Sequence, residues 1–232
     1  MKMKSIKRVL VASLVATMVF GSVFTVSATS GGTNASSGKE ESKKEETPAP
    51  AVVESAEVFT STPAMQENVV SVSAGGAVSV GGASVRSTIA GATIVKSLQG
   101  VAVKTPLADV KASLGLTGSQ TPYVVAYDTS AKKSPLAMQC VDAAISAAGG
   151  SFVSAINVDL CAKDNGKIVT LANGSAAMAA GLPKTADQSK TYYVVCVQPG
   201  GVITILEDQD TNPATVTFEI KAGLATYAIA SK

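Results

Sequence analysis

Residues 207–219, EDQDTNPATVTFE, contain the residue types of a calcium-binding loop. Position 6 of the helix–loop–helix calcium loop calls for glycine, but here it is Pro213, whose ring fixes φ near −65°. The residues after Pro213 alternate as a strand, which at about 3.3 Å per residue carries Glu219 roughly 20 Å away. The residues at loop positions 1, 3, 5 and 12 are Asp208, Asp210, Asn212 and Glu219. We therefore predict a solvated acidic turn between strands and no metal site.

The chain contains no histidine, which excludes Ser-His-Asp hydrolysis, Cys-His proteases and His-ligated zinc or iron sites. Ser130 and Lys133 match the S-x-x-K spacing of serine acyltransferases, but no K-T-G follows them. A carboxylate pair could still hydrolyse a glycoside, although the folded part has no tryptophan and few aromatic residues to hold a sugar ring. The carboxylates considered for that role are Asp128, Asp142 and Asp159. We predict no catalytic residue and no cofactor.

Two tyrosines are the candidate binding residues. Tyr123 and Tyr127 lie four residues apart in PYVVAYD, a predicted strand, so they point to one side of it. Tyr192 and Tyr193 lie in another predicted strand. Exposed tyrosines could bind glycans or protein by stacking and hydrogen bonding, whereas tyrosines at this density also close the edge of a core. The exposure of the Tyr123 ring distinguishes these two interpretations.

Three cysteines, Cys140, Cys161 and Cys196, follow the leader. Their number is odd and their spacing matches no zinc knuckle. Each lies in an apolar context, which is typical of small buried side chains. One disulfide with one free thiol is the alternative.

Residues 1–28 have the organisation of a signal peptide. Basic residues precede an uncharged apolar run from Val9 to Phe20, and VSA (Val26 to Ala28) is a small-x-small cleavage site. An uncleaved membrane anchor is the alternative. Residues 29–66 are rich in Gly, Ser, Thr, Pro and mixed charge, and contain too little apolar surface to offset the entropy of ordering. They are predicted to form a disordered linker or stalk.

The charge of the mature chain suggests no polyanionic partner. The leader contains four of the 19 basic residues and none of the 17 acidic ones, which leaves 15 basic residues and a net charge of −2. The folded part has no run of Lys or Arg. We therefore expect neither nucleic acid nor anionic lipid as a partner, and membrane association only through an uncleaved leader.

Residues 67–163 are predicted to form an α/β segment. Glycine-broken β-prone runs come first, followed by two helices that begin at TP (Thr105, Pro106) and SP (Ser134, Pro135), where Thr or Ser caps and Pro takes the first helical position. Strands are predicted at PYVVAYD and SFVSAINVDLC. This order predicts short helices laid on a sheet.

Residues 164–232 are predicted to be an antiparallel β module. YYVVCVQ and VITIL flank the turn PGG, while TVTFEI and LATYAIA flank KAG. In TVTFEIK the alternation places Val216, Phe218 and Ile220 inward and the residues between them outward. The fold class is thus α+β, with a C-terminal antiparallel β-sandwich-like module, and the sequence leaves open whether the body is one domain or two.

Four segments follow one another in the C-terminal third of the chain: GLPKTAD, KTYYVVCV, GGVITILEDQDTNP and VTFEIKAGLATYAIA. In this order they resemble a module of exported and surface proteins of anaerobic Gram-positive bacteria. The family commonly has Phe-Ser before Thr-Tyr, where this chain has Leu224 and Ala225. The resemblance implies a small β-sandwich-like building block of extracellular proteins with no catalytic residues.

Together these features predict an extracellular protein, secreted or associated with the cell envelope. Its predicted role is binding or structural, without catalytic activity. Its expected partner is cell-wall polysaccharide or a surface protein. The alternatives are a carboxylate-based enzyme acting on wall or glycan substrates, and a secreted inhibitor or effector. Two carboxyl groups about 5 to 10 Å apart in a cleft would favour the enzyme.

Overall fold

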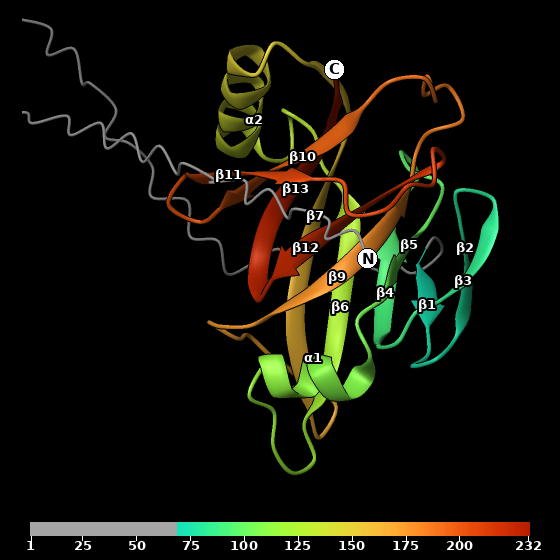
Figure 1. Cartoon of the computed structure of the whole chain (residues 1–232). Helices are drawn as coiled ribbons and strands as arrows, with labels where there is room; N and C mark the ends of the chain where they lie inside the picture. Colours follow the sequence, from blue (N-terminus) through green and yellow to red (C-terminus); the bar gives the residue numbers. More distant parts are fainter. Residues whose placement is uncertain (1–68) are drawn as a thin grey trace, which may run out of the picture. The chain divides into compact units, whose positions relative to one another are not determined.

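The fold is known from a computed structural model, which describes residues 69–232. The predicted leader (1–28) and stalk (29–66) lie outside the described residues. Thirteen strands and two helices form within residues 69–232, so the fold is a β-rich α+β fold (Figure 1). No helix in this part of the chain is long and apolar enough to span a membrane.

The larger sheet has eight strands and draws on both ends of the described chain. Its strands pair antiparallel except β4 and β6, which are parallel. Their order is β1 (Val70–Val72), β4 (Ala90–Ile94), β6 (Thr121–Asp128), β7 (Ser151–Asp164), β13 (Gly223–Ser231), β10 (Tyr192–Gln198) and β11 (Val202–Glu207), with β8 (Lys167–Val169) paired to β7 off this path. Because β13 lies between β7 and β10, residues on both sides of the predicted 163/164 boundary share this sheet.

A second sheet joins the same two segments. Its three strands are β12 (Thr215–Lys221), β9 (Ser175–Gly181) and β5 (Val101–Val103), all antiparallel. β2 (Ala77–Val80) and β3 (Ala83–Arg86) form a separate hairpin. β5 belongs to the first segment and β9 to the second, so the three-stranded sheet, like the eight-stranded one, draws on both segments.

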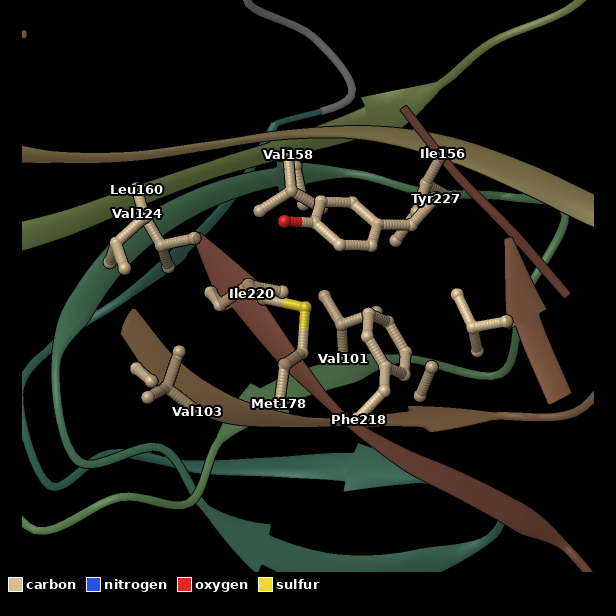
Figure 2. Packing of buried hydrophobic residues seen from close by; sticks show 14 of the residues in the cluster. Val101, Val103, Val124, Ile156, Val158, Leu160, Met178, Phe218, Ile220 and Tyr227 are labelled. Carbon is tan, nitrogen blue, oxygen red and sulfur yellow. The ribbon is translucent and has the colours of Figure 1, made fainter. Parts of the chain in front are cut away.

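The main core lies between the two larger sheets. Figure 2 shows Ile156, Val158 and Tyr227 of the eight-stranded sheet turned toward Met178 and Phe218 of the three-stranded sheet. The ring centroids of Phe218 and Tyr227 are 5.4 Å apart. This packing buries large apolar side chains on both inner faces, which is the main favourable contribution to folding.

The alternation predicted for β12 is confirmed on its inner side. Val216, Phe218 and Ile220 are fully buried. Thr217, which was expected to face solvent, is buried as well, and this part of the prediction is wrong. The cause is the acidic turn, because Asp208 accepts a hydrogen bond from the Thr217 N–H (2.9 Å) and Asp210 accepts one from its hydroxyl.

Both predicted helices form, but neither has the expected side-chain capping hydrogen bond. α1 spans Leu107–Ser113, and Pro106 rather than Thr105 precedes it, because the Thr105 hydroxyl accepts the Ala177 N–H of β9 (2.6 Å). α2 spans Pro135–Ala147 with Pro135 in its first turn, as expected. Ser134 precedes α2, but its hydroxyl makes no capping bond.

Candidate functional site

Helix α2 covers only part of one face of the large sheet. Its buried residues Met138, Val141 and Ile145 pack on a small-residue surface that includes Ala155 of β7 and Ala228 of β13. Beyond the N-terminal end of α2 the same face continues over β6, β7 and β13. We call this surface the tyrosine face. Its residues are Tyr123, Val125, Tyr127, Asn157, Asp159, Cys161, Leu224 and Thr226.

Strand register arranges the tyrosine face in three rows. The row nearest α2 is polar and its hydrogen bonds are satisfied. Tyr127 lies opposite Asn157, which lies opposite Thr226. The Thr226 hydroxyl donates to Asn157 Oδ1 (2.7 Å), and Asn157 Nδ2 donates to Ser134 Oγ (3.3 Å). The Ser134 hydroxyl, which could have capped α2, therefore links the start of the helix to β7.

The phenol of Tyr127 also belongs to this polar row. Burial raises the pKa of Tyr127, a hydrogen bond with Asn157 opposes the shift, and the charge of Asp159 adds to it. Tyr127 is only half-buried, so part of its ring remains available to a ligand. The polar row thus fixes a tyrosine ring at the surface through a hydrogen-bonded partner.

The middle row holds a carboxyl group between apolar neighbours. Asp159 lies opposite Val125 on one side and opposite Leu224 on the other. Only 6% of Asp159 is exposed, and its Oδ1 has no hydrogen-bond partner among the described residues. Burial raises the pKa of the Asp159 carboxyl because the charged form loses its hydration. A buried polar atom without a partner is costly, and a ligand donor would satisfy it.

The outer row pairs Tyr123 with Cys161. Lys163 Nζ lies 3.6 Å from the centroid of the Tyr123 ring, in cation–π contact. Cys161 is fully buried, and burial together with the charge of Asp159 raises the pKa of its thiol to about 12. Tyr123, like Tyr127, is half-buried. Both residues are therefore partly exposed, on either side of Asp159.

A groove of about 430 Å³ adjoins the tyrosine face. Its walls are the first turns of α2 and the turn after β10, and its floor includes Asn157, Leu224 and Thr226, which also belong to the tyrosine face. Leu136 of α2 lines it and is 72% exposed. The groove and the tyrosine face thus form one continuous surface, apolar for the most part, with a few hydrogen-bonding groups. That composition is typical of ligand sites.

The candidate carboxylates are not brought together. Asp128 lies at the end of β6 opposite Ile156, a core residue, so alternation places it on the other face of the sheet from Asp159. Its carboxylate accepts the N–H groups of Lys96 (2.8 Å) and Ser97 (3.1 Å). Asp142 is exposed on α2. Asp128 and Asp159 therefore cannot act on one bond.

The S-x-x-K pair lies in the turn that precedes α2. Ser130 accepts the N–H of Lys133 at its carbonyl oxygen (3.0 Å). The Lys133 ammonium group donates to the carbonyl oxygen of Asp128 (3.1 Å) rather than to the Ser130 hydroxyl.

The side-chain oxygens of the acidic turn accept hydrogen bonds from the turn's own backbone N–H groups. Asp208 accepts the N–H of Asp210 (3.1 Å), Asp210 accepts that of Asn212 (2.9 Å), and Asn212 accepts that of Ala214 (3.1 Å). Glu219 instead forms an ion pair with Lys221 (2.8 Å). No group of three or more His, Cys, Asp or Glu residues suited to hold a metal ion occurs within residues 69–232.

Tyr192 and Tyr193 are core residues rather than binding residues. Tyr192 is buried in the main core and donates to the carbonyl oxygen of Asp187 (2.8 Å). Tyr193 is buried against α2. The three cysteines are free thiols, with Cys161 and Cys196 buried and Cys140 half-buried at the groove.

Sequence reasoning identified the two surface tyrosines and named Asp159 as a candidate hydrolytic carboxylate, but it did not place Asp159 between the tyrosines and missed Asn157. Alternation in SAINVDLC does place Asn157 and Asp159 on one face, and this signal was available. The contribution of Leu224 and Thr226 depends on β13 pairing with β7, about 65 residues away in the chain, and no local pattern reveals it.

No family model matches the chain, and neither a curated protein nor a solved structure matches it.

Proposed function

We propose that the protein is an exported binding protein of the cell envelope, without catalytic activity, and that its tyrosine face and groove recognise a cell-wall polysaccharide. The leader and stalk predicted from the sequence support export. The resemblance of residues 164–232 to β-sandwich-like modules of exported proteins is in keeping with this location. The observation that carries the proposal is the buried Asp159 carboxyl between two half-buried tyrosine rings.

The spacing of these groups suits an extended sugar chain. Tyr123 and Tyr127 are four residues apart on β6, so their Cα atoms are about 13 Å apart along the strand. Tyrosine rings contact the apolar faces of sugars, and a sugar hydroxyl between them would reach the buried Asp159 Oδ1 once the neighbouring side chains shift. The net charge of −2 for the mature chain and the cation over Tyr123 place no strong single-sign field on this surface.

The carboxylate arrangement supports binding rather than hydrolysis. A glycosidase needs a second carboxyl group about 5 to 10 Å from the first, in the same cleft, so that the two flank the scissile bond. Asp128 lies on the opposite face of the sheet and is already hydrogen bonded. Asp159 alone would hold a sugar hydroxyl without cleaving the chain.

Fractionation of the producing culture tests the export part of the proposal. We expect the protein, with the mass of the chain cleaved after Ala28, in the wall fraction. An uncleaved mass in the membrane fraction would indicate that the leader anchors the protein in the membrane and that the protein is not secreted. Protein confined to the cytoplasm would refute the proposed location.

Retention on isolated wall material tests recognition. The protein should bind insoluble wall polysaccharide stripped of protein, and Tyr123→Ala/Tyr127→Ala should release most of it. Leu107→Ala is the matched control, because Leu107 is an exposed apolar residue (39%) on α1, a helix whose buried Val110 packs into the main core on the other face of the large sheet. Binding that requires untreated wall with its proteins present would identify a surface protein as the partner. Equal retention of the double variant would refute the assignment of the site.

A further inference from the structure

Within residues 69–232, β11 ends the large sheet, and its outer edge has no strand paired to it. It pairs with β10 along six residues, and no described strand pairs with its other edge. Such an edge presents a row of backbone N–H and C=O groups to any strand that approaches it. Figure 1 shows β11 beside β10.

The side chains of β11 favour pairing with another strand. Val202–Leu206 contains no charged residue and no proline, and its register with β10 is continuous, without a bulge. Val202, Ile203 and Ile205 are 56%, 43% and 51% exposed. Natural edge strands usually avoid this combination through lysine, proline, a bulge or very short length. The opposite edge strand, β1, has only three residues.

The strand is complementary to its own copy. VITIL reads nearly the same in both directions about Thr204. In an antiparallel pair with a twofold axis at Thr204, Ile203 faces Ile205 and Val202 faces Leu206 of the second copy. Glu207, the only charged residue of β11, faces Gly201, so like charges do not meet. An isologous interface requires this kind of self-complementarity in shape and charge.

We propose that two copies of this chain pair antiparallel through β11, across a twofold axis at Thr204, and so join their two large sheets into one. Ile203 and Ile205 lie opposite Val197 and Val195 of β10, on the face that carries α2. Leu206 packs partly against the main core on the other face. Pairing therefore covers exposed apolar side chains and supplies partners to the backbone groups of the edge. The proposal does not depend on the polysaccharide proposal.

Charge placed at the axis provides the sharpest test. Thr204 is exposed and would face its own copy, so Thr204→Lys and Thr204→Glu each bring like charges together. We expect the purified full chain to sediment as a dimer and each variant to sediment as a monomer with unchanged circular dichroism. A one-to-one mixture of the two variants should recover the dimer, since Lys then faces Glu.

Ile168→Lys is the matched control, because Ile168 is 49% exposed on β8, close to the 51% of Ile205. It should leave the dimer intact. The proposal is overturned by a monomeric wild type, by a Thr204→Lys variant that remains dimeric, or by a variant mixture that stays monomeric. Dissociation by Ile168→Lys would place the interface at β8 and would overturn it as well.

Discussion

Asp159 lies in an environment that opposes its ionisation. Burial raises the folded-state pKa of this carboxyl above its value in the unfolded chain. Between these two pKa values the folded state binds more protons, so the contribution of Asp159 to stability falls as pH rises through that window and stays low above it. The same desolvated oxygen is what a ligand hydroxyl would satisfy.

Replacing Asp159 by asparagine should therefore stabilise the protein at neutral pH. Asp159→Asn removes the cost of the buried charge, and its gain over wild type should shrink in acid, where the carboxyl of the wild type is protonated. Chemical unfolding at pH 7 and pH 4 measures the difference. Asp142→Asn, on the exposed side of α2, should change little at either pH. A variant less stable than wild type at pH 7 would mean that the Asp159 carboxylate has a favourable partner.

Two buried tyrosines offer a matched pair of variants. Tyr193 has a buried hydroxyl with no hydrogen-bond partner among the described residues, so Tyr193→Phe should leave stability unchanged or raise it. The Tyr227 hydroxyl accepts the Lys221 N–H (2.8 Å), so Tyr227→Phe should lower the free energy of unfolding by about 1 kcal/mol. Thermal and denaturant unfolding compare the two. If Tyr193→Phe lost stability and Tyr227→Phe did not, the Tyr193 hydroxyl would be the one with a favourable partner, which contradicts the structure.

Thiol reactivity should follow burial. Burial raises the pKa of Cys161 to about 12 and also raises that of Cys196, whereas Cys140 is half-buried at the groove. The thiolate is the reactive form, so native protein should take up one equivalent of iodoacetamide at Cys140 and three equivalents only when unfolded. Intact mass and peptide mapping give the sites. Equal labelling of Cys161 in the native state would contradict the burial described here.

At the scale of elements, three glycines hold the small sheet against its neighbours. Gly81 donates its N–H to the Gln99 carbonyl (2.8 Å), and Gly181 donates to the Gly100 carbonyl (2.9 Å). A Cβ atom on Gly181 would lie 2.3 Å from both the Gln99 carbonyl oxygen and the Gly81 nitrogen. These are backbone atoms, so relief requires the strands to separate.

Gly181→Ala should accordingly lower the free energy of unfolding by about 1–3 kcal/mol or more. Ser84→Ala, an exposed substitution on β3, is the control and should have little effect. Unfolding in urea measures both. If Gly181→Ala is as stable as the control, the close approach of β9 to the loop before β5 is not tight in solution.

Local sequence patterns predicted the helices and strands better than they predicted which strands pair with each other. The Ser-Pro start of α2 and the inward residues of β12 follow from rules that act within a few residues, and they are found in the structure. The Thr105 cap failed because a strand distant in sequence took the hydroxyl. Likewise, the isolation of Asp159 depends on Val125 and Leu224 in adjacent strands. Strand pairing over long separations is set by the whole core, and alternation alone leaves it open.

At the scale of the whole molecule, the proposed polysaccharide site and the proposed dimer interface lie on one sheet. The polar row and the two tyrosines lie on β6, β7 and β13 at the middle of the sheet, while β11 forms its end. Pairing through β11 would place two tyrosine faces on one continuous sheet, related by a twofold axis. Two linked sites bind a repeating polymer more tightly than one, because the second contact is intramolecular.

Calorimetric titration of solubilised wall polysaccharide into wild type and Tyr123→Ala/Tyr127→Ala tests the central claim most directly. The two rings should together contribute enough that the double variant binds about tenfold more weakly or worse, while Leu107→Ala, on α1, binds like wild type. Equal dissociation constants for wild type and the double variant, or no binding by wild type, would contradict the claim that this face recognises polysaccharide.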